Sequence, residues 1–404
     1  DLTGDWSSDV CSSDPLMISL EEQNQVAMRV SDKGQALFFD VGTGAELKRV
    51  DLPLAAGVSV VSIGKDQPGS PLVILGLSNG QSLVFRHTYK VSYPDGKKTI
   101  SPAIEYPYGE TPIVLDDAGR PLEHVALNAT DTSLVVAGSA GSRLNVLSLS
   151  REENMMTGEV TSEQKRIELP QMTEPVKAIF IDPRQQWLYV INGRALADVF
   201  SLRDKSLNGR YKLLEDGGAE ITASTQLVGG ISLIVGNSKG GLAQWFMARD
   251  PDGEQRLKQI RTFEMGTAPI VEITAEERRK GFTALDASGK FGVFHSTAHR
   301  TLLVDPVVDG QGVFGLSPRA NRVIVEAGGK LQPLLLDNPH PEVSWSALWS
   351  KVWYENYDEP KYVWQSTAAN TDFEPKMSLA PLTFGTLKAA FYAMLLAADR
   401  KSVV

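Results

Sequence analysis

The residue types that most often carry chemistry are sparse in this chain. Histidine, a common general base and zinc ligand, occurs five times, and two of these residues, His295 and His299, are four positions apart. The pair follows a predicted strand end and lacks the intervening glutamate of a zinc-protease helix. We therefore expect no metal site there, and the sequence assigns no catalytic residue and no cofactor site.

Motifs that bind phosphate groups are also weak. No Gly-x-x-x-x-Gly-Lys-Ser/Thr loop is present, so we expect no ATP hydrolysis by this chain. Residues 138–141 read Gly-Ser-Ala-Gly, but no helix start follows them, and a hairpin turn explains them better than a phosphate cradle. Four cations adjoin predicted turns, where they would mainly solvate the surface: Arg143, Arg194, Lys239 and Arg319.

The two ends of the chain are not natural protein sequence. Residues 5–14 match, one for one, a reading frame of a common short-read sequencing adapter, and residues 399–404 match a frame of the companion adapter. We exclude residues 1–14 and 399–404 from the fold prediction, as one would exclude a tag. The only cysteine, Cys11, is thereby excluded, so no disulfide or thiol nucleophile is expected.

The composition is that of an ordinary globular protein. The 404 residues are 42% apolar and 22% charged, which excludes wholesale disorder and a fibrous rod. The formal charge is −9, and about −6 without the two end segments, so a nucleic-acid partner is not expected.

A repeat of about fifty residues fills the chain from residue 15 to residue 338. Each unit is a short apolar run, a turn that contains glycine, and a second apolar run, which is the pattern of a β-hairpin. The turn glycines are Gly34, Gly80, Gly141, Gly193, Gly240, Gly289 and Gly329. Seven such hairpins, each with room for further strands, predict an all-β fold: a seven-bladed β-propeller of the WD40-like type.

The longest interval between turn glycines, from Gly80 to Gly141, contains extra residues. We interpret residues 86–111 as an elongated hairpin that projects from the second blade. It is either an arm that docks a partner or a solvated insertion.

Aromatic residues are concentrated in the segment 339–378, which follows the propeller. Residues 345, 348, 349, 352 and 353 are spaced as on one face of a helix, so we predict an aromatic amphipathic helix. Aromatic rings of this kind settle at the headgroup level of a membrane, although a helix that caps the propeller would use them as core. The predicted membrane-interface residues are Trp345, Trp349, Trp353, Tyr354, Tyr357, Tyr362 and Trp364.

Residues 379–398 are almost entirely apolar. Lys388 is their only charged residue, and the apolar run ends where the adapter-derived residues begin. A complete span needs about 20 apolar residues, so we interpret this segment as the truncated start of a membrane helix, in contact with lipid.

This C-terminal region resembles a known family. The aromatic segment 345–364, the residues Asp-Phe-Glu-Pro at 372–375 and the run 381–387, which ends in Gly385, Thr386 and Leu387, are similar to the entry into the permease core of phosphate-specific ABC importers. The chain resembles the long form of the C-type permease subunit, in which a large β domain separates the first two membrane helices. The Gly-Thr-Leu element is common to many importer permeases; the whole segment is more specific.

The resemblance implies a location and a set of partners. The propeller would lie on the periplasmic side of a bacterial inner membrane, with a docking or regulatory role in phosphate uptake. The implied partners are a second permease subunit, cytoplasmic ATPase subunits and a periplasmic phosphate-binding protein. Residues that line the phosphate path would lie beyond residue 398, so none is assigned here.

Two other functions remain open at the level of sequence. The chain is alternatively a propeller scaffold for protein assembly in the cell envelope, without a transport role. A propeller enzyme would need acidic residues, histidines or a metal gathered on the axis, and the sequence identifies no such group.

Overall fold

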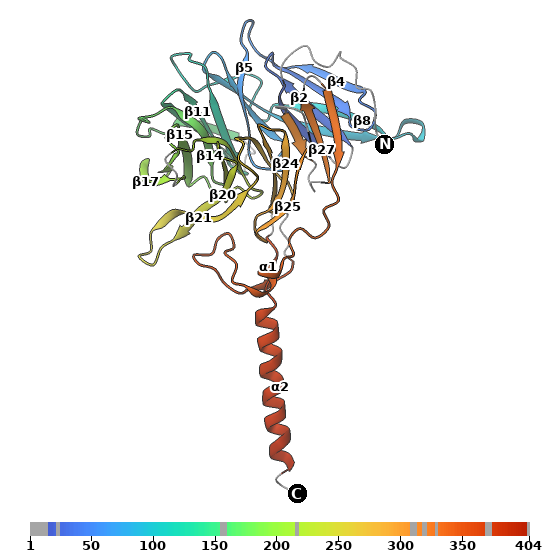
Figure 1. Ribbon diagram of the computed structural model, residues 1–404. Helices are drawn as coiled ribbons and strands as arrows, with labels where there is room; N and C mark the ends of the chain where they lie inside the picture. Colours follow the sequence, from blue (N-terminus) through green and yellow to red (C-terminus); the bar gives the residue numbers. More distant parts are fainter. Residues whose placement is uncertain are drawn as a thin grey trace.

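The computed structural model describes residues 15–21, 25–153, 160–214, 218–307, 313–316, 321–327, 330–367 and 374–401. In this part of the chain, seven antiparallel sheets surround a central axis, and a long helix projects from one side of the ring (Figure 1). The predicted seven-bladed propeller is therefore confirmed.

Consecutive strands form each of the first four blades. Blade 1 contains β1 (Pro15–Glu21), β2 (Val26–Ser31), β3 (Gln35–Asp40) and β4 (Glu46–Asp51); blade 2 contains β5 (Val60–Lys65), β6 (Leu72–Leu77), β7 (Gln81–Ser92), β8 (Thr99–Glu105) and β9 (Ile113–Val114), with a 3-10 turn at Pro94–Gly96; blade 3 contains β10 (His124–Ala129), β11 (Ser133–Ala140), β12 (Arg143–Glu153) and β13 (Val160–Arg166); blade 4 contains β14 (Val176–Ile181), β15 (Trp187–Asn192), β16 (Leu196–Ser201) and β17 (Ser206–Lys212).

The remaining blades and the C-terminal elements follow in chain order. Blade 5 contains β18 (Ile221–Gln226), β19 (Leu233–Asn237), β20 (Gly241–Arg249) and β21 (Gln255–Glu264); blade 6 contains β22 (Ile270–Ala275), β23 (Gly281–Asp286), β24 (Lys290–His295) and β25 (Arg300–Pro306); blade 7 contains β26 (Val313–Leu316), β27 (Arg322–Ala327) and β28 (Lys330–Leu335); then come α1 (Trp345–Trp349), β29 (Trp364–Gln365), β30 (Lys376–Met377) and α2 (Ala380–Lys401).

Apolar packing between neighbouring blades holds the ring together. Seven clusters of buried apolar side chains occur in the described residues, and each one joins two adjacent blades. The cluster that closes the ring packs Ile324 of blade 7 against Ile18 and Leu20 of blade 1. Gly315 of β26 faces Ile18 so closely that a Cβ added to it would lie 2.7 Å from the Ile18 side chain. Each sheet thus has its two apolar faces covered by the neighbouring sheets.

The turn residues explain why the hairpins form where the sequence places them. In blade 6, the Asp286 carboxylate accepts hydrogen bonds from the backbone N–H groups of Ser288 and Lys290, at 2.9 and 3.0 Å. Gly289 adopts a φ of +84°, which costs glycine little. Asn237 and Gly240 form the same arrangement in blade 5.

The strand order gives the ring two different faces. The loops between the first and second strands and between the third and fourth strands of each blade lie on one face, which we call the lower face. The turns between the second and third strands lie on the opposite, upper face. The C-terminal segment contacts Ser232 and Lys280 in the lower loops of blades 5 and 6, and α2 projects from this lower face (Figure 1).

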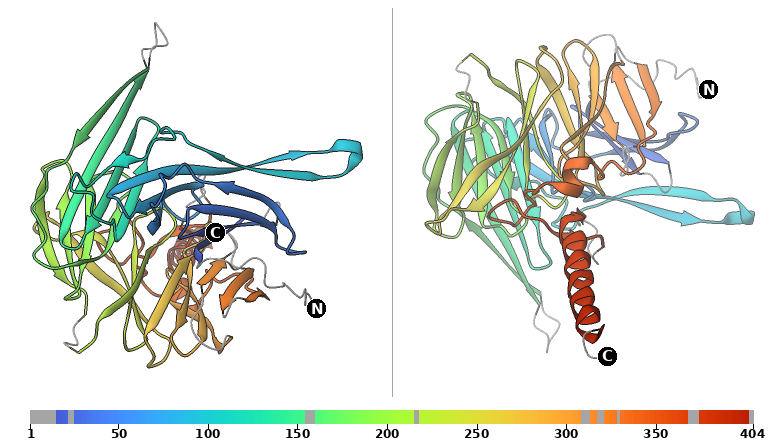
Figure 2. Two further views of the ribbon diagram at one scale, coloured as in Figure 1. Left: turned by 90° about the horizontal axis from the view of Figure 1, so that it is seen from above. Right: turned by 60° about the horizontal axis from the view of Figure 1, so that its bottom comes forward.

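The predicted elongated hairpin of blade 2 is present. β7 and β8 pair from Arg86 opposite Glu105 to Ser92 opposite Thr99, and they extend outward from the ring (Figure 2). Near its base, the hairpin rests on blade 1, where Lys48 donates to the Pro102 carbonyl at 3.0 Å. Tyr93 at its tip is 66% exposed.

The predicted aromatic helix is shorter than the sequence pattern indicates. α1 ends at Trp349, and Ser350 is extended, with a ψ of 164°. Val352 instead forms a β-bridge with Lys361, with hydrogen bonds of 3.1 and 3.0 Å between their backbones. This bridge draws Val352 and Trp353 out of the helical path, so only the first three of the five spaced residues lie on a helix.

Candidate membrane anchor and its attachment

α2 is an apolar helix without a protein environment. Residues 380–398 have a mean hydropathy of 1.3, and none of that window is buried against the rest of the protein. Its large apolar side chains are between 44% and 72% exposed: Leu382, Phe384, Leu387, Phe391, Tyr392, Met394, Leu395 and Leu396. Length and composition suffice for a membrane span, and water is a poor solvent for such a surface.

Two polar side chains of α2 contact groups of their own helix. The Thr386 hydroxyl donates to the Leu382 carbonyl at 2.9 Å, so it presents no unpaired hydrogen to the surroundings. The Lys388 ammonium lies 6.0 Å from the centre of the Tyr392 ring. The residues Gly385, Thr386 and Leu387, which carry the resemblance to importer permeases, lie on the second turn of this helix and are exposed.

Four of the seven predicted interface aromatics are exposed near the start of α2. Trp345 is 81% exposed, Tyr362 is 45% exposed, and Trp349 and Trp364 are each 43% exposed. The backbone fixes their position relative to α2, because the Leu379 N–H donates to the Leu348 carbonyl in α1 at 2.8 Å. These rings are therefore available to a surface that α2 enters.

The other three predicted interface residues are less exposed. Trp353 meets Phe246 of blade 5 edge-on, with ring centres 6.1 Å apart, and its indole N–H donates to the Tyr357 carbonyl at 2.8 Å. Tyr354 is only 1% exposed, and burial raises the pKa of its hydroxyl to about 12. The Lys376 ammonium lies within 6 Å of the rings of both Tyr354 and Tyr357. The aromatic segment 339–378 is thus partly buried and partly exposed.

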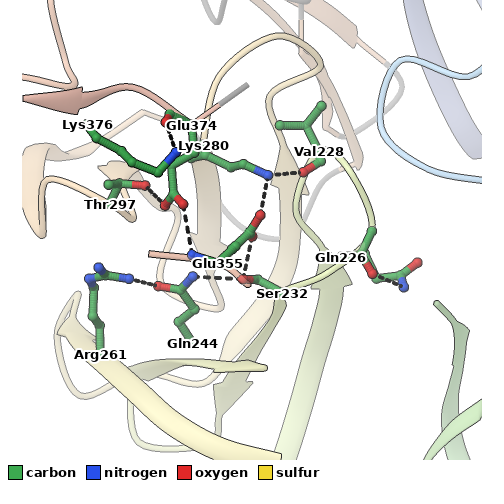
Figure 3. A network of polar contacts seen from close by, with 11 residues as sticks. Gln226, Val228, Ser232, Gln244, Arg261, Lys280, Thr297, Glu355, Glu374 and Lys376 are labelled. Carbon is green, nitrogen blue, oxygen red and sulfur yellow. Dashed lines mark hydrogen bonds and ion pairs between the residues drawn. The ribbon is translucent and has the colours of Figure 1, made fainter. Parts of the chain in front are cut away.

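A buried ion pair joins this segment to the lower face of the ring (Figure 3). The Lys280 ammonium of blade 6 contacts the Glu355 carboxylate at 2.5 Å, and both side chains are at most 4% exposed. Lys280 also donates to the Val228 carbonyl of blade 5, and the Ser232 hydroxyl donates to Glu355 at 2.6 Å. Glu355 therefore connects two blades to the segment that leads to α2.

Arg261 of blade 5 makes a second buried link (Figure 3). Its guanidinium donates to the Gln244 side-chain oxygen at 2.8 Å and to the Trp353 carbonyl at 2.6 Å. The Gln244 amide in turn donates to Ser232 at 2.9 Å. Gln244 and Ser232 are fully buried, so the network satisfies polar groups that would otherwise destabilise the core.

Glu374, two residues before β30, completes the network. One carboxylate oxygen accepts from the Thr297 hydroxyl of blade 6, and the other accepts from the Glu355 N–H at 2.8 Å. Burial and the neighbouring Glu355 carboxylate raise the pKa of Glu374 above its usual range. We call these residues, Ser232, Gln244, Arg261, Lys280, Thr297, Glu355 and Glu374, the joint.

The histidines and cations considered as site candidates in the sequence do not converge on a site. His295 is buried, accepts from the Ala298 N–H, and has its pKa lowered by burial to about 3, whereas His299 contacts the Thr262 carbonyl at 2.8 Å. Arg143 and Arg194 lie at the upper turns of blades 3 and 4, Lys239 lies at that of blade 5, and Arg319 lies outside the described residues. Residues 138–141 form the end of β11 and its turn, as predicted.

A cavity of about 780 Å³ follows the axis of the ring and is lined by the innermost strands of all seven blades. Its titratable residues have mixed charge: Lys65, His124, Lys177, Glu220, Glu272 and Glu277. Glu272 accepts from the Phe314 N–H at 3.3 Å, and burial raises its pKa to about 8. In the described part of the chain, no group of three or more potential ligands among His, Cys, Asp and Glu is placed to hold a metal ion.

The joint was not found from the sequence. Lys280 and Glu355, which form its ion pair, are 75 residues apart in the sequence, and no motif or spacing connects them. One signal was present: Gln244 interrupts an otherwise apolar strand at a position that faces the core. A polar residue at such a position requires a buried partner, but the sequence does not say which residue that partner is.

The joint gives a prediction for stability. Lys280→Met leaves the Glu355 carboxylate buried without a counter-charge, so we expect the free energy of unfolding in urea to fall by about 3–5 kcal/mol. The control is Lys361→Met, which removes an exposed pair with Glu359 at 3.6 Å and should cost less than about 1 kcal/mol. Equal losses in the two variants would contradict a structural role for the joint.

The axial cavity gives a prediction for pH dependence. The folded-state pKa of Glu272 lies above its unfolded value, so its contribution to stability is complete below pH 4.5 and is lost as the pH rises through about 8. Glu272→Gln has no proton to lose, so its stability relative to the parent should rise between pH 5 and 9, by about 4 kcal/mol at the end of that range. Thermal unfolding across this range, with the exposed Glu254→Gln as control, measures the difference. A constant offset at every pH would refute the assignment.

Comparison with known proteins supports the fold and leaves the family open. No protein-family model and no curated protein matches this chain. Among solved structures, the chain is similar to the β-propeller domain of Cps50 (Swd1) from Myceliophteria thermophila, with a TM-score of 0.55 and 9% sequence identity. The match covers 81% of this chain and 98% of that one. At this level of identity, the likeness shows that the chain has a β-propeller fold of the WD40 kind.

Proposed function

We propose that this chain is the extracytoplasmic propeller of a phosphate ABC importer permease, held at the inner membrane by α2, with a docking or regulatory role in phosphate uptake. The observation that carries the proposal is an exposed apolar helix mounted on a buried polar joint. A helix that served only as a flexible tail would not need such an attachment.

The energetics of α2 favour a lipid environment. Eight large apolar side chains are about half exposed or more, and full burial of each is worth about 1.5–3 kcal/mol. Lys388 opposes insertion by about 3 kcal/mol, and it can reduce this cost by extending toward the interface. The balance favours insertion by several kcal/mol, since the helix already satisfies its own backbone hydrogen bonds.

The exposed aromatics support a membrane boundary at the base of the propeller. Trp345 and Trp349 lie beside the first turn of α2, where the Leu379 backbone is bonded to Leu348. Indole rings favour the headgroup region, so the lower face of the ring would face the membrane at close range. The upper face and the blade 2 hairpin, with exposed Tyr93, Lys97 and Lys98 near its tip, would remain open to partners on the extracytoplasmic side.

The assignment to a phosphate importer has a further support, which is the similarity of the C-terminal segment to permease subunits. This similarity implies three kinds of partner: a second permease subunit, cytoplasmic ATPase subunits and a phosphate-binding protein in the periplasm. The propeller itself would be non-catalytic. Residues that conduct phosphate would belong to membrane helices that follow α2.

Membrane binding is tested by vesicle flotation. The purified chain is expected to float with phosphatidylglycerol–phosphatidylethanolamine vesicles, whereas a variant that ends at Leu379 should stay at the bottom of the gradient. Tryptophan quenching by brominated lipid should be strong for the full chain and weak for a matched variant with Trp345, Trp349 and Trp364 replaced by serine. Equal flotation with and without α2 would refute the anchor.

The transport role is tested in cells. Disruption of the uninterrupted gene is expected to abolish high-affinity uptake of radiolabelled phosphate and to leave sulfate uptake unchanged, because importers recognise their own solute. Reintroduction of the gene should restore uptake. Unchanged phosphate uptake with loss of an envelope complex would instead identify the chain as an assembly scaffold.

A further inference from the structure

Glu272 lines the axial cavity without a counter-charge. It lies on β22, the innermost strand of blade 6, and its carboxylate accepts from the Phe314 N–H of blade 7 at 3.3 Å. In the described part of the chain, no cationic side chain pairs with this carboxylate. We propose that Glu272 is the counter-ion for a small organic cation, an alkylammonium, that binds in the axial cavity.

The strands packed against β22 explain why Glu272 is unpaired. In the described residues these strands are β18, β19, β23 and β26, and β18, β19 and β26 contain no titratable side chain. β23 contains one, Asp286, whose carboxylate accepts from the Ser288 hydroxyl at 2.6 Å and from the backbone of its own turn. These strands therefore supply no positive charge to Glu272.

The other titratable residues of the cavity wall have partners or reach solvent. At the lower end, the Glu277 carboxylate attracts the Lys65 ammonium and offsets part of the lowering of its pKa by burial. At the upper end, Lys177 and Glu220 are exposed. Burial lowers the pKa of His124, which favours its neutral form.

The loop between β5 and β6 crosses the lower end of the cavity. Gln67 and Pro68 of this loop are part of the cavity wall. Gly69 reaches blade 6, where a Cβ added to it would lie 3.2 Å from the Glu277 carbonyl oxygen. The upper end, with the exposed Lys177 and Glu220, is therefore the entrance for a small solute.

The lining of the cavity favours an alkylammonium over a metal ion. The described residues bring no group of three or more metal ligands together, and the cavity volume of about 780 Å³ is that of a site for a small organic molecule. Much of the wall is apolar, including Ile18, Ile179, Ile273 and Phe314. An alkylammonium would place its charge at the Glu272 carboxylate and its methylene groups against this wall.

The binding of a cation at Glu272 is linked to the loss of a proton. Burial raises the pKa of Glu272 to about 8, so the unoccupied site holds a proton at neutral pH. An ammonium pairs with the ionised carboxylate and must displace this proton. The apparent affinity should therefore rise nearly tenfold per pH unit from about pH 6 to 7 and become constant above about pH 8.

Ligand-observed NMR titration of the purified full chain tests this inference, and it does so in detergent, without relying on membrane insertion. The probes are n-butylammonium chloride and two molecules of similar size, 1-butanol and sodium butyrate. At a pH above 8, n-butylammonium should bind at least about tenfold more tightly than 1-butanol, because only the cation pairs with the carboxylate, and butyrate should not bind. The pH profile of n-butylammonium binding is measured on the same chain.

A matched pair of variants assigns the binding to Glu272. Glu272→Gln keeps the size of the side chain, so it should reduce the affinity for n-butylammonium to that for 1-butanol and remove the pH dependence. Glu254→Gln, at an exposed position of blade 5, should leave the affinity unchanged within about twofold. The proposal is overturned if the parent chain does not bind n-butylammonium, binds it no better than 1-butanol, or binds it equally well after Glu272→Gln.

Discussion

The contact between Lys280 and Glu355 is the interaction on which the arrangement of this protein depends. Two charges that are removed from water are costly unless each is paired and hydrogen-bonded. Lys280 and Glu355 meet this condition only when the C-terminal segment lies against blades 5 and 6, where Ser232 and the Val228 carbonyl complete their bonding. The ion pair is therefore specific for one docked position of the segment that carries α2.

The joint is attached to a rigid ring, and it needs this rigidity to hold α2 in one position. Apolar clusters between every pair of neighbouring blades make the seven sheets mutually dependent, so a displacement of blade 6 is resisted by blades 5 and 7. Blade 7, which closes the ring against blade 1, has three strands in the described residues, whereas every other blade has at least four.

The features predicted from the sequence are those encoded locally. The turn at Asp286 and Gly289 needs a carboxylate acceptor and a residue with positive φ, and both lie within four consecutive positions of the sequence. The apolar character of α2 is equally local. Trp353 shows the limit of local information: its type and spacing suit a membrane interface, but contact with Phe246 from a distant blade decides its position. The joint, whose members are far apart in sequence, depends entirely on such tertiary contacts.

The central claim is that the joint fixes the propeller at one orientation relative to α2. The most direct measurement is the distribution of distances between spin labels at Glu254 of blade 5 and Leu382 of α2, both exposed, in a Cys11→Ser background and in lipid nanodiscs. Pulsed electron resonance should give one narrow distance that broadens when Lys280 is replaced by methionine. A broad distribution in the parent chain would contradict the account.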